Sequence, residues 1–139
     1  MSTLARIVVA LLGAVVALCA FVPWTLASTA AELPARTLLA TRSAELGTFA
    51  TSLAVPLLVA AAVVVAAALL GSRAGVLVGG LLCAGIPLAW ILVNALAPHG
   101  PATVELSAIR AGAYVTAVSG IFIVLVAALS ADTRRPSAR

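Results

Sequence analysis

Side chains able to do chemistry are few in this chain, and they are scattered. The thiols are Cys19 and Cys83, the only imidazole is His99, and one of the four carboxylates is Glu105. A CxxC pair, a histidine cluster, or a carboxylate inside an apolar segment would indicate redox, metal or proton-transfer chemistry. The sequence contains none of these arrangements. We therefore predict no catalytic, cofactor-binding or metal-binding site.

The two thiols fit a packing role better than a redox role. Cys19 and Cys83 lie 12 and 7 residues into the apolar segments that start at Ile7 and Val76. In parallel helices their depths would differ by about 7–8 Å, more than a disulfide usually spans. We therefore predict two buried free thiols, which argues against an oxidoreductase built on a reactive cysteine pair.

The elements that must position these residues are indicated by where charge is missing. No Asp, Glu, Lys or Arg occurs in residues 7–31, 46–72, 74–104 or 111–131. Each stretch holds about 20 mostly apolar residues, the length at which a helix crosses a hydrocarbon core of about 30 Å. Apolar residues make up 64% of the chain and its mean hydropathy is +1.26, which leaves little polar surface for a water-soluble fold. We predict an all-α integral membrane four-helix bundle embedded in a lipid bilayer.

The predicted bundle forms one domain, residues 1–139. Its spans are 7–26, 50–70, 76–97 and 111–129. Outer loops 27–49 and 98–110, a cytoplasmic turn 71–75 and a cytoplasmic tail 130–139 connect or follow them. The first span also resembles a signal peptide with a cleavage site near Ala30, but its apolar run is longer than a typical cleavable one. We favour an uncleaved first helix.

The distribution of the eight arginines predicts the orientation. Five of them fall on one side of the predicted spans: Arg6, Arg73, Arg134, Arg135 and Arg139. The other three fall on the opposite side: Arg36, Arg42 and Arg110. Because arginines near span ends favour the cytoplasmic face, both termini should be cytoplasmic in a multi-pass protein of the bacterial inner membrane. The arginines form no basic face that could follow phosphates, so nucleic acid is not an expected partner.

Aromatic and polar residues add detail near the outer surface. Trp24, Trp90 and Tyr114 lie in the outer halves of their spans, where we expect the rings at the lipid interface. Thr29 and Glu32 have capping-box spacing, which favours a short amphipathic helix within 27–49. An irregular loop over the mouth of the bundle remains the alternative.

Small residues recur at helical spacing and predict close helix packing. The clearest stripe is Gly112, Thr116 and Gly120, and a second one begins with Gly75 and Gly79. Helices in lipid associate through such small residues. The stripes could face sister helices or a partner protein, and the sequence leaves both open.

Two residues could interrupt the third span. Pro87 removes a backbone hydrogen bond and should kink the helix. We interpret this kink as a simple bend in preference to an ion-binding site. Asn94 should turn inward and bond another helix, a contact worth about 0.6–2 kcal/mol. Packing is favoured over substrate binding at both positions.

Three features are similar to a known group of proteins. Pro23-Trp24 closes the first span, the second span 52–70 is rich in Ala and Val, and small residues form the turn 71–75. The chain thereby resembles small actinobacterial four-span proteins, including the tryptophan-operon-associated membrane protein family. An arginine-only, Ala/Val-rich composition agrees with an actinobacterial origin. The resemblance implies a fold type and no activity.

Three functions are compatible with these sequence features. The favoured one is a non-catalytic accessory or assembly subunit, whose partners are other membrane protein subunits or copies of itself. The alternative is an oligomeric transporter or channel for an uncharged or lipidic solute. An enzyme at the outer surface would have to use Glu105, His99 or Arg110, which show no recognisable catalytic arrangement, so we rank it last.

Overall fold

The computed structural model describes residues 1–26, 28–35, 49–96 and 109–130, with residues 94–96 as backbone only. Within these residues the chain forms four α-helices, one 3₁₀ turn and no β-strand. The elements are α1 (Thr3–Cys19), η2 (Phe49–Thr51), α2 (Ala54–Leu70), α3 (Arg73–Leu96) and α4 (Ala111–Leu129). The prediction of four helices is confirmed.

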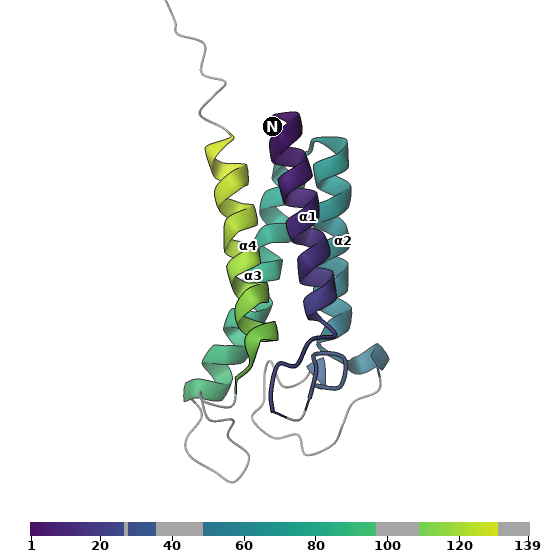
Figure 1. Cartoon of the computed structure of the whole chain (residues 1–139), viewed down its shortest axis with the longest axis vertical. Coiled ribbons are helices and arrows are strands. Elements are labelled where there is room, and N and C mark those ends of the chain that lie inside the picture. The colour runs from purple at the N-terminus through teal and green to yellow at the C-terminus, as the bar shows by residue number, and fades with distance from the viewer. Residues whose placement is uncertain (27, 36–48, 97–108, 131–139) are drawn as a thin grey trace, which may run out of the picture.

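The helices run alternately up and down, so that each packs against two neighbours. α1 packs on α2 and α4, and α3 packs on the same two helices from the other side. Figure 1 shows two distinct ends. The start of α1, the α2–α3 turn and the end of α4 form one, which we call the Arg6 end. Residues 20–35, η2 and the start of α4 form the other, which we call the Trp24 end.

α1 occupies a different range from the predicted span 7–26. It begins at Thr3 because the Ser2 hydroxyl accepts a hydrogen bond from the N–H of Ala5 (3.2 Å) and caps the helix. It ends at Cys19, and the chain then turns, because the ring of Pro23 disfavours helical backbone at the preceding residue. The charge-free stretch 7–31 therefore contains most of an apolar helix, as predicted. The predicted bounds of that helix are wrong at both ends.

The α2–α3 turn is tighter than predicted, since only Gly71 and Ser72 separate the helices. Gly71 has a φ of 71°, a left-handed conformation that suits glycine. The N–H of Ser72 donates to the Ala67 carbonyl (2.8 Å), while its hydroxyl accepts from the N–H of Gly75 (3.3 Å). Two residues thus end one helix and begin the next.

The remaining bounds differ little from the prediction. α2 starts at Ala54, four residues late, because η2 occupies the start of the predicted span. α3 starts three residues early and continues through Pro87. Figure 1 shows its final part inclined away from the rest of the helix. α4 covers the predicted range 111–129.

In α2, small side chains face the interior of the bundle and large ones occur on its surface. In α2 the buried positions include Ala60, Ala61, Ala67 and Ala68, whereas Leu69 is 71% exposed. Large aliphatic side chains are exposed along all four helices. By length and composition, α3 over Arg73–Val93 and α4 could cross a membrane, while α1 and α2 are apolar helices of 17 residues each.

Candidate functional site

The stripe predicted in α4 lies against α3 at its centre. A Cβ atom built on Gly120 would lie 2.7 Å from the Cα of Ala84 and the carbonyl carbon of Cys83. A Cβ built on Gly80 of α3 would lie 2.8 Å from the side chain of Ile123 of α4. The two backbones can approach this closely only because glycine has no side chain.

The glycines near the start of α3 lie against α2. A Cβ on Gly79 would meet Val64 at 2.6 Å, and one on Gly75 would meet the Cβ of Ala67 at 2.7 Å. Gly13 of α1 approaches α2 in the same manner, since a Cβ built on it would lie 2.9 Å from the Val65 side chain. Gly13, Gly75, Gly79, Gly80 and Gly120 therefore face sister helices within the described residues.

Gly112 and Thr116 extend the α4 stripe toward the Trp24 end. A Cβ on Gly112 would lie 2.8 Å from the carbonyl oxygen of Pro23 and against the indole of Trp24. Thr116 is fully buried, and its hydroxyl donates to the Gly112 carbonyl (2.7 Å). Its side chain also interacts with the thiol of Cys19 across the α1–α4 contact. Gly112 thus faces the segment that follows α1, and Thr116 faces the end of α1 itself.

Pro87 and Asn94 occupy the part of α3 that approaches the Trp24 end. Pro87 is fully buried inside the helix, and its ring nitrogen cannot donate to the Cys83 carbonyl one turn earlier. The predicted side-chain bond of Asn94 falls outside the described atoms.

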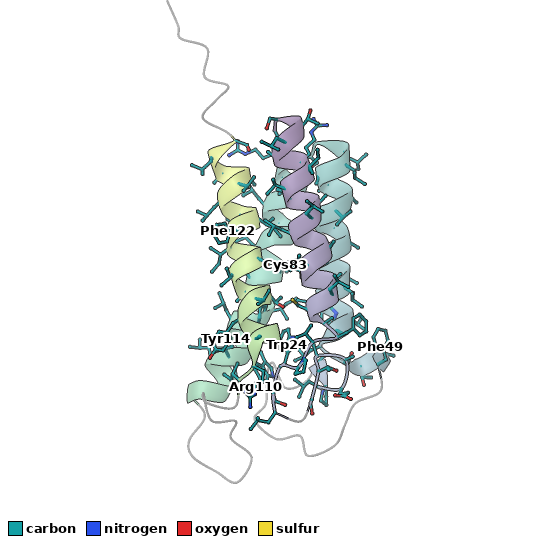
Figure 2. All side chains as sticks on the ribbon, viewed as in Figure 1. Trp24, Phe49, Cys83, Arg110, Tyr114 and Phe122 are labelled. Atoms are coloured by element: carbon teal, nitrogen blue, oxygen red, sulfur yellow. The ribbon has the colours of Figure 1, made fainter. Side chains whose placement is uncertain are left out.

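A tryptophan pair fills the interior at the Trp24 end. Trp24 and Trp90 are at most 1% exposed, and their rings meet edge to face with centroids 5.7 Å apart. The indole N–H of Trp24 donates to the Cys19 carbonyl (2.9 Å). Figure 2 shows Trp24 inside the bundle, whereas Tyr114 projects from α4 and is 46% exposed. The expected interfacial position is therefore wrong for both tryptophans, because their apolar area is used to fill the core.

Residues 20–26 and 28–35 fold over the Trp24 end and cap two helices at once. The carbonyls of Leu33 and Ala30 accept the N–H groups of Leu53 (2.8 Å) and Ala54 (3.1 Å) at the start of α2. The Trp24 carbonyl accepts the N–H of Arg110 (2.9 Å) at the start of α4. The first N–H groups of a helix have no partner within it, so this segment supplies the missing acceptors.

The predicted capping box is half formed. The Glu32 carboxylate accepts the backbone N–H of Thr29 (2.8 Å), but the N–H of Glu32 donates to the Thr29 carbonyl instead of its hydroxyl. Residues 28–35 form turns, so no helix begins at Thr29. The rest of the predicted amphipathic helix, residues 36–48, lies outside the described residues, as do His99 and Glu105.

Two arginines lie at the Arg6 end in different settings. The Nε of Arg73 donates to the Ala127 carbonyl (2.9 Å) in the last turn of α4. The guanidinium of Arg6 lies over Gly71, where a Cβ would be 2.7 Å from its central carbon. The Nε of Arg6 is buried and has no hydrogen-bond partner among the described residues. Sequence reasoning assigned both arginines to topology alone.

A groove of about 380 Å³ begins beside Arg6 on the outside of the bundle, between α1 and α2. Its lining is formed by Thr3, Arg6, Ile7, Ala10, Leu11, Ala68 and Leu69. The sequence gives no signal for this groove, because it depends on how far apart two helices lie.

The thiols and the possible metal ligands of the described residues do not form a group of three. Cys19 and Cys83 are buried free thiols. No three residues among His, Cys, Asp and Glu gather into a metal-binding group within the described part of the chain. No protein family model matches the chain, and no curated protein or solved structure is significantly similar to it.

Proposed function

We propose that the chain is a multi-pass protein of the bacterial inner membrane in which all four helices cross the bilayer. The supporting observation is the apolar surface around the bundle. Leu11, Leu81 and Phe122, on three different helices, are 62%, 60% and 54% exposed. A soluble monomer rarely exposes a continuous apolar surface of this size, whereas lipid tails solvate it. Figure 2 shows Phe122 projecting outward from α4.

The orientation follows from the arginines at each end. Arg6 and Arg73 lie at the Arg6 end, which also carries both termini of the bundle. Under the positive-inside rule this end faces the cytoplasm.

Washing membranes with alkaline carbonate tests the membrane location, because an integral protein stays in the pellet. Release into the supernatant would contradict the proposal.

Within the membrane we assign the chain a non-catalytic role as an accessory or assembly subunit of a larger complex. Two of its polar side chains serve the fold: Thr116 bonds its own helix, and Arg73 bonds the end of α4. The close-packing glycines are also used inside the bundle. Contacts with a partner would therefore use the exposed aliphatic surface and the Trp24 end.

Purification in a mild detergent tests this role. The expected result is one partner protein retained at constant stoichiometry through two successive affinity steps with tags at opposite termini. A monomer that carries no other protein, from membranes cross-linked before extraction, would contradict it.

The second candidate is an oligomeric transporter or channel for an uncharged or lipidic solute. Pro87 favours it, because the ring leaves a backbone carbonyl in the middle of α3 without its usual donor. The interior of the bundle is filled by Trp24, Leu57 and Ile123, so a pathway would have to lie between copies. Solute flux into liposomes that falls in Pro87→Ala and Asn94→Leu, with folding retained, would support this role over the accessory role.

A further inference from the structure

The groove between α1 and α2 combines a charged end with an apolar body. Arg6 and Thr3 lie at its Arg6 end, and Ile7, Leu11 and Leu69 continue it along the bundle. From Thr3 to Leu11 the α1 side of the groove extends over about 12 Å, at 1.5 Å per residue. Ile7, Leu11 and Leu69 are exposed, so the groove opens on the lateral surface of the bundle.

The charged end has an unused hydrogen-bonding group. The Nε of Arg6 is buried without a partner among the described residues, and a buried donor left unbonded is costly. The guanidinium is planar and can offer several donors to one group with two or more acceptor oxygens. Gly71 makes room for it, since a Cβ there would meet its Nη atom at 2.5 Å.

The surroundings favour an anion at this place. The described residues of the Arg6 end include two arginines and no Asp or Glu. The Nε of Arg73 already bonds the Ala127 carbonyl, so Arg6 is the arginine facing the groove. Thr3 is the first residue of α1, and the N–H groups of a first helical turn attract negative charge.

We propose that this groove binds an anionic phospholipid, with its phosphate on Arg6 and one acyl chain along Ile7, Ala10 and Leu11. The inference rests on the membrane location proposed above. Basic pockets between helices on the cytoplasmic side are suited to such headgroups. The apolar body takes the acyl chain, and the arginine recognises the headgroup through charge and hydrogen bonds.

Native mass spectrometry of the purified full-length protein tests the headgroup part. The protein is offered equal amounts of phosphatidylglycerol and phosphatidylcholine with identical acyl chains. The expected adduct ratio is about fivefold in favour of phosphatidylglycerol, as one arginine near a headgroup supplies. Arg6→Gln should bring the ratio to about one, while Arg73→Gln, the matched control, keeps the wild-type ratio. Equal ratios in wild type and Arg6→Gln would overturn the proposal, as would an equal loss in Arg73→Gln.

Filling the groove tests the acyl-chain part. Ala10→Phe should block the groove and reduce bound phosphatidylglycerol several-fold. Ala14→Phe is the matched control, because Ala14 lies one turn further along α1, is exposed and does not line the groove. Unchanged binding in Ala10→Phe would overturn the assignment. Displacement of the lipid by excess glycerol phosphate would also overturn it, since a free phosphate would then suffice.

Two further measurements separate the sources of failure. Helical circular dichroism and gel filtration establish folding, and Arg6→Lys replaces Arg6→Gln if the latter does not fold. Arg6→Lys keeps the charge and should retain a ratio above about twofold, whereas a ratio of one overturns the proposal. Carbonate washing reports on the membrane location independently, so an integral protein without lipid preference contradicts the lipid site alone.

Discussion

At Gly120 the backbone of α4 lies directly against that of α3, and one methyl group would change the contact. Its Cβ would come within 2.7 Å of the Cα of Ala84. Gly85, on the same α3 helix, is exposed, and a Cβ there would meet nothing within 4 Å. The two glycines have the same helix propensity and differ only in what surrounds them, so they form a matched pair.

Gly120→Ala should lower the free energy of unfolding by about 1–3 kcal/mol, because an added methyl overpacks the α3–α4 contact. Gly85→Ala should be neutral or stabilise by up to about 1 kcal/mol, since alanine favours helix. Unfolding in mixed micelles, followed by circular dichroism, measures both. Equal effects of the two substitutions would contradict the close approach at Gly120.

The tryptophans give a second prediction for single residues. Trp24 and Trp90 are buried against each other, so brominated lipids should quench their fluorescence weakly. A tryptophan placed at exposed position 114, in a Trp24→Phe/Trp90→Phe background, should be quenched strongly. Strong quenching of the native pair would place the rings at the lipid interface instead.

The connections between the helices are held by different contacts at the two ends of the bundle. At the Arg6 end, Gly71 and Ser72 reverse the chain and Arg73 bonds the end of α4. At the Trp24 end, the carbonyls of Trp24 and Leu33 cap two other helices. The Arg6 end therefore ties α3 to α2 and to α4, whereas the Trp24 end ties the segment after α1 to the starts of α2 and α4.

Arg73→Leu should destabilise the bundle by about 1–2 kcal/mol, because it removes a charged donor from the Ala127 carbonyl at the end of α4. Arg73→Lys should recover part of this loss through its charge. The same mixed-micelle unfolding assay measures the change. If Arg73→Leu is as stable as wild type, the bond contributes nothing.

The direction of the helices can be tested by labelling. In a Cys19→Ala/Cys83→Ala background, cysteines at Ser72 and Ser130 should react from the cytoplasmic side and a cysteine at Ala50 from the other. This follows because the first two lie at the Arg6 end and the third at the Trp24 end. An impermeant maleimide added to intact cells and to inverted vesicles distinguishes the sides. Labelling of positions 72 and 130 from opposite sides would contradict the topology.

For the whole molecule, the decisive property is an apolar surface around an interior in which small residues line the close helix contacts and a few large side chains fill the rest. Many large aliphatic side chains lie outside, where the proposed bilayer would contact them. A water-soluble bundle has charged and polar side chains on its outer faces instead.

A charged substitution on this surface tests whether it contacts lipid or water. Phe122→Asp, near the middle of α4, should reduce membrane-inserted protein, because a carboxylate there costs about 2.5–3.5 kcal/mol on an insertion scale. Ser130→Asp, just beyond α4, should have little effect. The fraction of protein that resists carbonate washing measures both. Full insertion of Phe122→Asp would indicate that this face does not contact lipid.

The sequence alone determined the number of helices, their order and which chain segments share an end of the bundle. Long apolar stretches predicted these features because a helix satisfies its own backbone locally, and Gly71 and Gly75 marked a short reversal. The resemblance to small actinobacterial proteins stays a prediction. The helix-packing residues were predicted from their spacing, because residues four apart share a face of a helix.

Only the tertiary structure decided what covers each face. Four-residue spacing places Gly112 and Gly120 on one face of α4 but does not specify that Trp24 and Ala84 lie against them. The start of α2 also depended on a distant partner, since the N–H of Leu53 is capped by the carbonyl of Leu33. Local patterns determine the helices, whereas hydrogen bonds and packing between segments far apart in the sequence determine their bounds and their interior.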